Sequence, residues 1–366
     1  MQVIDTGIVY RNPMPHVWSR HAYFPSLVSL GGGELICSFV RAQAFEAEDA
    51  RLHLCRSRDG GRTWNSEGRM FAEREAPSYY FEGGRMALLA DGDLLMMVSL
   101  ADKRRREEGL SNPATLGFAE TTLVSHRSTD GGRTWTEASA VTPPLVGPEF
   151  EICSSPVQLS DGRLLYPSST WKAWDGASPT GMKAVAFISD DSGATWPRHV
   201  VTLDGTPDQV VHWESKVIEL AAGRLLAVSW AFDEPNSVSL PNHFSLSADG
   251  GDSFSSPAAT DLSGETPAVL GLGPDEALCV YRRTDVAGLY AARVSLAGGR
   301  WTTGEQLECF GTGALYGTDS QNQSEKFAVL RFGAPCVTRL DDGSVLVAFW
   351  VVEECVSNIR WVRLAL

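Results

Sequence analysis

Four copies of one short pattern constrain the fold of this chain more than any other feature. Each copy has a Ser, an Asp two residues later, a glycine within the next two residues, and an aromatic residue at its eighth position. The copies occupy residues 57–64, 128–135, 189–196 and 247–254. An Asp that caps backbone N–H groups beside a turn glycine is typical of a tight hairpin. The pattern therefore predicts four hairpins, each with its aromatic side chain packed against the next sheet.

The spacing of the copies extends this prediction to most of the chain. The copies start at residues 57, 128, 189 and 247, so neighbouring copies lie 71, 61 and 58 residues apart. An eroded fifth copy occupies residues 295–301, 48 residues further on, with Ala297 in place of the Asp. A period of this length predicts repeated β-sheet modules.

A second repeat, in register with the first, gives the number of modules. Each copy is a short apolar run, a turn that contains glycine, and a second apolar run. Six copies occupy residues 27–36, 87–95, 157–165, 217–226, 270–278 and 337–346. The runs before the turns are short and apolar, as expected of inner strands buried on both faces. Residues 351–366 supply only part of a sixth module, and residues 2–9 are predicted to complete it.

The Ser-x-Asp-x-Gly-x-Thr-Trp pattern resembles the Asp-box, or BNR repeat, of the sialidase (neuraminidase) superfamily. The resemblance covers nearly the whole chain. It implies an all-β fold, a six-bladed β-propeller whose last blade is closed by the N-terminal strand, as one domain over residues 1–366. In that superfamily the box lies on hairpins away from the substrate face and serves folding, so it identifies a fold and leaves the activity open.

Composition limits the partners of such a domain. The chain has 45 acidic and 31 basic residues and a net charge of −14, which disfavours nucleic-acid binding. It has no transmembrane stretch, and residues 1–20 lack the apolar run of a signal peptide. A cytoplasmic location is therefore expected, unless a leader has been removed from a secreted form. The seven cysteines lack a C-x-x-C pair, so they are predicted to be reduced thiols, with no metal or cofactor. The oligomeric state is left open.

The repeats also predict where chemistry can take place. If the glycine turns share one face of the propeller, the starts of the inner strands and the ends of the second strands converge on the other. Polar, charged and aromatic residues occupy the inner-strand starts: His21, Tyr23, Phe24, Glu82, Arg85, Glu149, Glu151, His212, Trp213, Glu214, Glu265, Arg331 and Phe332. Similar residues occupy the second-strand ends: Arg41, Trp171, Trp230, Asp233, Arg282, Arg283, Trp350 and Glu353. Carboxylates, arginines and indoles around one opening are typical of a carbohydrate site.

The resemblance assigns roles to some of these residues. Glu214 matches the inner-strand Glu that polarises a tyrosine nucleophile in sialidases. Arg41 resembles the arginine that ends the second strand of the first blade there. An acidic proton donor follows that arginine in the family, and three carboxylates fit here: Glu46, Glu48 and Asp49.

A carboxylate-binding arginine is also implied in blade five. The segment 280–290 resembles the one that carries it, with Arg283 as the first choice and Arg282 as the alternate. Consecutive side chains of a strand point to opposite faces, so one of the two can face the site while the other pairs on the surface.

Three departures weigh against the usual sialidase chemistry. Tyr23 stands where the first arginine of the family's triad is expected, and Trp230 lies near the place of the second. The last inner strand begins with residues 333–336 and lacks the tyrosine nucleophile, while Tyr316 lies in the loop before it. Loss of two charge-assisted contacts removes about 1.5 to 3 kcal/mol each from substrate binding.

Three functions therefore remain open. Glu151 and Glu214, with Glu149 or Glu265 as alternates, could hydrolyse a glycoside, with an acidic sugar preferred, by direct acid/base chemistry. A polysaccharide lyase or rhamnosidase-like enzyme would use histidine and arginine, for which His21 and His212 are the candidates. A glycan-binding propeller would need only the aromatic side chains: Tyr23, Trp171, Trp174, Trp213 and Trp230. Two carboxylates about 5 to 9.5 Å apart beside an arginine would favour hydrolysis.

Overall fold

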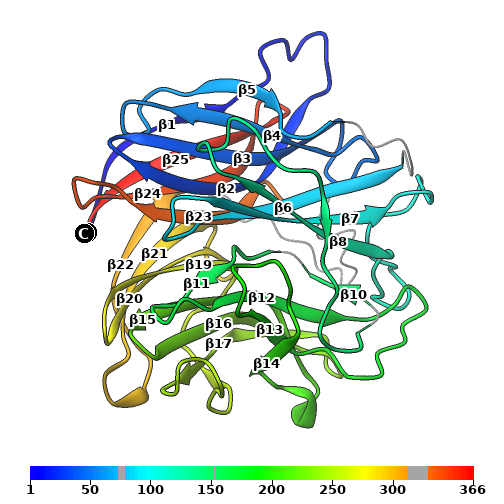
Figure 1. Ribbon diagram of the computed structural model, residues 1–366, viewed down its shortest axis with the longest axis vertical. Helices are drawn as coiled ribbons and strands as arrows, with labels where there is room; N and C mark the ends of the chain where they lie inside the picture. Colours follow the sequence, from blue (N-terminus) through cyan, green and yellow to red (C-terminus); the bar gives the residue numbers. More distant parts are fainter. Residues whose placement is uncertain (73–78, 148, 152, 312–328) are drawn as a thin grey trace.

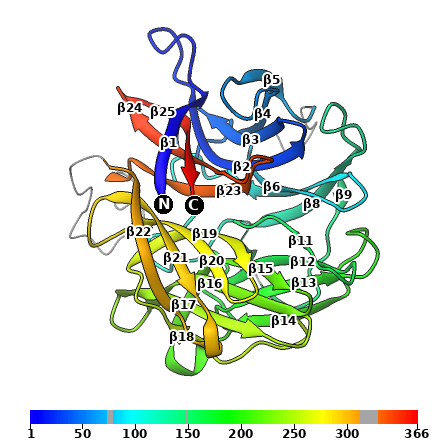
Figure 2. The same ribbon diagram turned by 90° about the vertical axis from the view of Figure 1, so that its left-hand side faces the viewer.

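The computed structural model describes residues 1–72, 79–147, 149–151, 153–311 and 329–366. Six antiparallel sheets follow one another in chain order around a common centre (Figures 1 and 2). Neighbouring sheets pack against each other, blades two and three through a shared hydrophobic cluster, and the sixth sheet contacts the first. The predicted six-bladed β-propeller is thus confirmed.

The first three blades occupy residues 21–203 of the chain. Blade one has β2 (His21–Gly31), β3 (Glu34–Ala42), β4 (Arg51–Ser57) and β5 (Asn65–Arg69). Blade two has β6 (Tyr80–Leu88), β7 (Leu94–Asp102), β8 (Thr121–Ser128) and β9 (Ser139–Ala140). Blade three has β10 (Glu149–Phe150), β11 (Val157–Gln158), β12 (Leu164–Trp171), β13 (Ala184–Ser189) and β14 (Arg198–Leu203).

The other three blades complete the ring. Blade four follows the 3₁₀ turn η1 (Thr206–Asp208) and has β15 (Val210–Ala221), β16 (Arg224–Asp233), β17 (Val238–Ser247) and β18 (Ala258–Ala259). Blade five has β19 (Gly264–Gly273), β20 (Glu276–Arg283), β21 (Gly288–Ser295), the turn η2 (Ala297–Gly299) and β22 (Thr302–Phe310). Blade six has β23 (Phe332–Arg339), β24 (Val345–Glu353), β25 (Val356–Ala365) and, as its outermost strand, β1 (Gln2–Tyr10).

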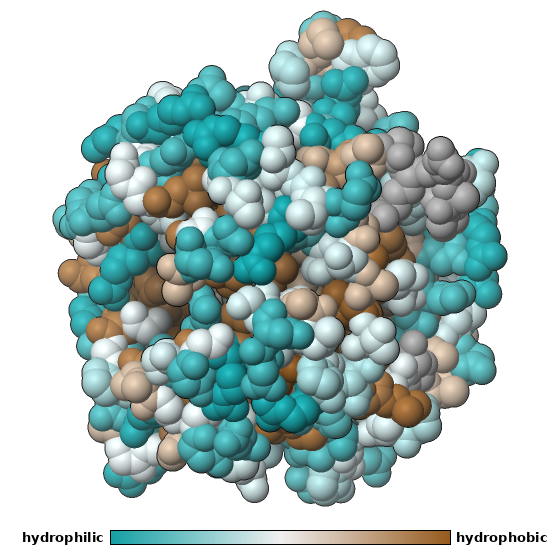
Figure 3. Space-filling model, in the orientation of Figure 1, coloured by the Kyte–Doolittle hydropathy of each residue, from teal (hydrophilic) through white to brown (hydrophobic). Residues whose placement is uncertain are grey.

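The N-terminal strand therefore closes the last blade, as the sequence predicted. β1 pairs with β25 in antiparallel register, and Gly7 lies opposite Trp361. Figure 2 shows the two chain ends side by side. The segment between β1 and β2 projects from the ring at the top of Figures 1 and 3, on a face that is mostly hydrophilic.

The hydrophobic core is divided among the contacts between blades. Six of the clusters of buried side chains each lie between two neighbouring blades. A strand between two such clusters must be apolar on both faces. In β3, Leu35 and Phe39 pack toward blade six, while Ile36 and Val40 pack toward blade two. Among the described residues, no helix has the length and apolar character needed to cross the membrane.

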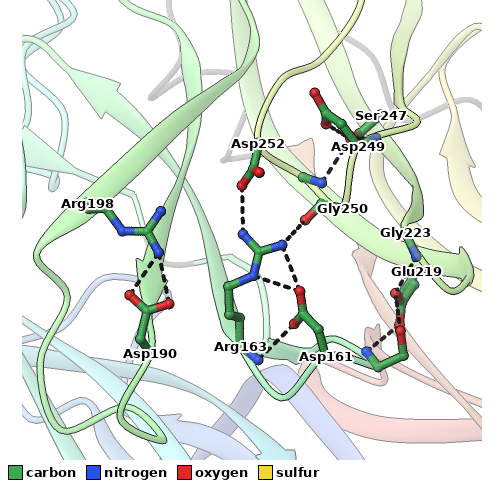
Figure 4. A network of polar contacts seen from close by, with 12 residues as sticks. Asp161, Arg163, Asp190, Arg198, Glu219, Gly223, Ser247, Asp249, Gly250 and Asp252 are labelled. Carbon is green, nitrogen blue, oxygen red and sulfur yellow. Dashed lines mark hydrogen bonds and ion pairs between the residues drawn. The ribbon is translucent and has the colours of Figure 1, made fainter.

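All four complete Asp-boxes form the same hydrogen-bonded hairpin. In the first, the Ser57 hydroxyl donates to Oδ1 of Asp59 at 2.8 Å, and the same oxygen accepts the N–H groups of Arg62 and Thr63. Figure 4 shows the fourth box, where Ser247 and Asp249 lie near Arg163 of blade three. The Arg163 guanidinium donates to Asp161, Asp252 and the carbonyl of Gly250, so it ties the box to the preceding blade.

The aromatic residue of each box packs toward the preceding blade, and the expected packing against the next sheet is wrong. Trp64 of blade one joins the cluster shared with blade six, and Trp135 of blade two joins the cluster shared with blade one. The close approach also explains the second glycine of the box: a Cβ on Gly61, whose φ is +86°, would lie 2.9 Å from Leu346 of blade six.

Candidate active site

Three adjoining cavities surround the axis of the propeller. Their volumes are about 160, 170 and 110 Å³, and Glu214 lines all three. We call them together the central mouth. Every blade contributes to its polar and aromatic lining: Phe24, Phe45, Glu46, Arg85, Glu151, Cys153, Trp171, Glu214, Lys216, Trp230, Glu265, Arg282 and Trp350.

A repeated β-bulge aims side chains into the mouth. The inner strands β2, β15, β19 and β23 each carry one extra residue at the same place relative to the second strand. The residues at these bulges are Phe24, Glu214, Thr266 and Ala334, with φ of +53°, +52°, +52° and +46°. All four line the mouth. Non-glycine residues in this region cost about 1 to 3 kcal/mol, so the surrounding packing must hold these bulges in place.

Glu214 and Glu151 form a close carboxyl pair at the mouth. The N–H of Glu214 donates to Oε2 of Glu151 at 2.7 Å, and the Cys153 thiol donates to Oε1 of Glu151 at 3.2 Å. Sγ of Cys153 also lies 3.8 Å from Oε1 of Glu214. One ligand atom from each of the three residues lies within 4.8 Å of the others. The hydrogen bond from the strained backbone of Glu214 thus links the position of one carboxyl group to the other.

The surroundings of this pair favour the protonated form of its carboxyl groups. Burial raises the pKa of Glu151, and burial together with the neighbouring Glu151 raises the pKa of Glu214 to about 7. The Lys216 ammonium opposes this shift from nearby, where it donates to the carbonyl groups of Cys153 at 2.7 Å and Glu214 at 3.2 Å. Near neutral pH the pair can therefore share a proton, as an acid/base catalyst requires.

The same trio is the one described group close enough to share a metal ion. Two carboxylates and a thiol supply three possible ligands. The charge of Lys216 acts on all three groups and opposes a second cation at this position. The donor set thus fits a proton-sharing carboxyl pair better than a metal centre.

Two arginines border the mouth, and both already have partners. Arg282 forms an ion pair with Glu265 across neighbouring strands of blade five. Arg85 is buried and donates to the carbonyl groups of Gly84 at 2.9 Å, Cys153 at 3.3 Å and Phe24 at 3.4 Å. Arg85 therefore holds inner strands together, while Arg282 is the arginine that can exchange its carboxylate partner for a ligand.

Aromatic side chains form much of the remaining wall. Phe24, Phe45 and Trp350 lie on one side, with ring centroids of Phe45 5.1 Å from Phe24 and 5.5 Å from Trp350. Trp171 and Trp230 lie on the other side, both packed against the buried ring of Trp213. Aromatic rings that line the same cavities as a carboxyl pair suit the binding of a sugar ring.

Several residues expected at the mouth lie elsewhere. Arg41 and Asp49 line a separate pocket in blade one. Glu48 pairs with Arg106 at 2.6 Å, and Arg283 pairs with Asp285. The physical reason differs between them: Arg41 and Arg283 lie on strand faces that point away from the mouth, whereas the loop after β3 directs Glu48 and Asp49 outward.

Three further residues that were expected to contact a substrate are packed inside the protein instead. His212 is fully buried and hydrogen bonded to His243 at 3.0 Å, where burial lowers its pKa to about 3. Tyr23 is buried between Phe45 and Trp350, and Trp213 lies beneath Trp171 and Trp230. These residues support the wall of the mouth from behind.

Other mouth residues had weak or no signals in the sequence. Of the three candidate proton donors after β3, it is Glu46 that lines the mouth; it accepts the N–H of Leu110 at 2.8 Å, and burial raises its pKa. Cys153 and Lys216 were missed, although each lies two residues after a glutamate of the pair. Tyr316 lies outside the described residues.

Comparison with known proteins agrees with this architecture. A family model described as BNR repeat-like domain matches residues 33–309. A sialidase from Micromonospora viridifaciens is 29% identical over 143 residues, which are 36% of this chain and 20% of that protein. The match therefore spans about a fifth of that relative's length.

Solved structures share the fold at low sequence identity. A protein of unknown function from Dyadobacter fermentans has a TM-score of 0.75 and 21% identity, covering 99% of this chain and 98% of its own. The NanB sialidase from Streptococcus pneumoniae has a TM-score of 0.66 and 10% identity, covering 98% and 70%. Trypanosoma rangeli sialidase in complex with sialic acid has a TM-score of 0.63 and 16% identity, covering 94% and 54%. The solved structures show a shared fold, and the family match over most of the chain shows that it belongs to the BNR repeat-like family of the sialidase superfamily.

Proposed function

We propose that this protein is a glycoside hydrolase that acts at the central mouth through Glu151 and Glu214. The observation that carries the proposal is the pairing of these two half-buried carboxyl groups, one of them with a pKa raised to about 7, inside an aromatic wall. A protonated carboxyl can donate to the leaving oxygen while its ionised partner acts at the anomeric carbon or on water.

The carboxyl separation favours retention of configuration. Retaining glycosidases place their two carboxyl groups about 5 to 5.5 Å apart, and inverting enzymes about 6.5 to 9.5 Å apart. One carboxyl oxygen of Glu151 lies within 4.8 Å of one of Glu214, which is shorter than the inverting range. None of the described residues that line the mouth is a tyrosine, so a carboxylate is the better candidate for the nucleophile.

Arg282 could determine whether the site prefers an acidic or a neutral sugar. A carboxylate or sulfate on the substrate would bind Arg282 by displacing Glu265, whereas a neutral sugar would leave that ion pair intact. An acidic sugar is therefore favoured only if its contact with Arg282 contributes more binding free energy than is lost when the Arg282–Glu265 ion pair breaks. A substrate panel must include both kinds of sugar.

A non-catalytic glycan-binding role has one observation in its favour, the aromatic wall. The lyase or rhamnosidase alternative has less support, because none of the described mouth residues is a histidine. His21 instead contacts Ser19 at 3.3 Å and accepts the N–H of Ser357 at 3.1 Å.

The test is turnover of aryl glycosides of neutral sugars, uronic acids and sialic acids by the wild type, Glu214→Gln and Glu151→Gln. We expect hydrolysis of at least one substrate, reduced by roughly 10² to 10⁴ in kcat in either variant. Glu219→Gln is the matched control, since Glu219 lies on the same strand but binds Ser160 and Gly223 and lines none of the three cavities (Figure 4). Sugar binding without turnover would favour the glycan-binding role, and full activity of both mouth variants would reject the carboxyl mechanism.

A further inference from the structure

A second pocket, in blade one, carries a concentration of positive charge that the carboxyl mechanism does not use. Its volume is about 540 Å³. Four arginines line it, together with His53 and a single carboxylate, Asp49: Arg20, Arg41, Arg51 and Arg69. We call it the arginine pocket. The excess of positive charge stands out in a protein with a net charge of −14.

The strand register brings these like charges together. Arg41 of β3 and Arg51 of β4 are directly opposite each other, and His53 of β4 is opposite Arg69 of β5. Like charges at directly opposed positions destabilise a sheet. An anion bound between the strands would weaken the repulsion between these positions.

The internal contacts of Arg41 and Arg20 differ from those of Arg51. Arg51 is held in place, because one of its nitrogens donates to the carbonyl groups of Glu48, Ala50 and Tyr80 at 2.8 to 2.9 Å. Arg41 forms no hydrogen bond or ion pair with another described residue. Arg20 lies over the ring of Trp18 at 4.9 Å. Guanidinium groups bind the planar or tetrahedral oxygens of oxyanions bidentately.

The pKa of the buried His53 imidazole reflects the nearby positive charges. His53 is 4% exposed, and its pKa is lowered to about 3, first by burial and then by the nearby charges of Arg41, Arg69 and Arg20. A bound anion would reverse the charge contribution to that shift.

The arginine pocket shares a wall with the central mouth. The loop between β3 and β4 places Phe45 and Glu46 in the mouth, and Gln43 and Asp49 in the arginine pocket. The loop is braced from within, since the N–H of Gln43 donates to Oδ1 of Asp49 at 3.1 Å and its carbonyl accepts the Ser19 hydroxyl at 3.1 Å. The central mouth and the arginine pocket therefore lie against the same short loop.

We propose that the arginine pocket binds the sulfate or phosphate ester of an anionic glycan whose neighbouring sugar occupies the central mouth. The glycan part of this inference rests on the proposed function, whereas the oxyanion site does not. Arg41 and Arg20 supply the recognition, with Arg51 as a fixed charge behind them. The role expected for Arg41 at the mouth is thus replaced by anion binding in a different pocket.

The first experiment titrates inorganic sulfate and phosphate into the wild type, Arg41→Gln and Arg20→Gln by calorimetry at low and physiological salt, with the His53 ring followed by NMR. We expect either variant to weaken binding at least tenfold, and salt to weaken wild-type binding. Arg198→Gln is the control, because Arg198 is an exposed arginine paired with Asp190 on another blade (Figure 4). Equal affinities of Arg41→Gln and Arg198→Gln, or no binding to the wild type, would overturn the oxyanion site.

Misfolding of the variants can be measured directly. Because Arg41→Gln removes a repulsion with Arg51, its melting temperature should be no lower than that of the wild type. A lower melting temperature would contradict the argument from register, and the Arg20→Gln variant, outside the strands, would then test the binding alone.

The second experiment separates the oxyanion site from the glycan. It compares a sulfated oligosaccharide with its desulfated form, using the wild type, Arg41→Gln and Glu214→Gln. We expect tighter binding of the sulfated form, lost in Arg41→Gln, and unchanged sulfate binding in Glu214→Gln. Sulfated oligosaccharide that binds no tighter than free sulfate would overturn the glycan inference alone. Arginine-dependent binding without any turnover would reject the proposed hydrolase and leave the oxyanion site standing.

Discussion

At the scale of single residues, the pH dependence of stability tests the description of Glu214. The pKa of its carboxyl group is raised in the folded protein to about 7 from an ordinary value of 4.5, so between these pH values the folded state binds more protons than the unfolded state. The free energy of unfolding should therefore fall as pH rises through this range, by on the order of 1 to 3 kcal/mol.

Chemical denaturation at pH 5 and pH 8 measures this effect. In Glu214→Gln the difference between the two pH values should shrink, because the glutamine does not titrate. The Glu219→Gln control, on the same strand, should keep the wild-type difference. An unchanged pH dependence in Glu214→Gln would mean that the Glu214 carboxyl group does not hold its proton near neutral pH.

Single residues also show where reading the sequence succeeds and fails. Counting from the glycine turns predicted that Glu151, Glu214 and Arg282 face the mouth, and the structure has them there. The count failed for Arg41 and Arg283, because neighbouring residues of a strand face opposite ways and the count alone does not choose between them.

The bulges were not predicted, although a signal for them exists. A bulge adds one residue and so breaks the two-residue alternation on which such counting depends. Proline follows the bulge residue in three of the four strands, as Pro25, Pro267 and Pro335, and proline inside a strand is typical of a bulge. Glu214 is followed by Ser215, so at the site itself that signal is absent.

At the scale of the element, the Asp-box predicts a contrast between two adjacent residues. Asp191 accepts hydrogen bonds from the Ser189 hydroxyl at 2.7 Å, the Thr195 N–H at 2.8 Å and the Thr195 hydroxyl at 2.6 Å. Within the described part of the chain, Asp190 pairs with the exposed Arg198 alone (Figure 4). Asp191→Ala should cost about 1 to 3 kcal/mol in the free energy of unfolding, and Asp190→Ala at most about 0.5 kcal/mol.

Urea denaturation of the two variants tests this contrast. Both remove one carboxylate from the same exposed hairpin, so any change in net charge is matched. Similar losses in the two variants would contradict a structural role for the box. The turn chemistry of the box is local, which is why the sequence predicted it well; the side toward which its aromatic residue packs depends on the neighbouring blade, and there the prediction was wrong.

At the scale of the whole molecule, the ring depends on contact between its two ends. β1 pairs with β25, which lies more than 340 residues away in the sequence. Met1 also forms an ion pair with Glu305 of blade five. An unpaired β25 would leave an exposed strand edge, which favours self-association. The β-forming residues 2–9 predicted this closure, since the sixth module lacked a strand.

Gly7 is the point at which closure is most sensitive to substitution. A Cβ at Gly7 would lie 2.8 Å from the ring of Trp361, which is 2% exposed and packs between blades six and one. Gly7→Val should therefore displace either the indole or β1 and lower the free energy of unfolding by about 1 to 3 kcal/mol. Gly304→Val is the matched control on the outermost strand of blade five, where the nearest atom lies 3.4 Å from the added Cβ. Thermal unfolding with light scattering should detect both the loss of stability and the self-association of Gly7→Val. If the two variants unfold alike, the N-terminal strand adds little to the ring, and blade six is held by its contacts with blades one and five instead.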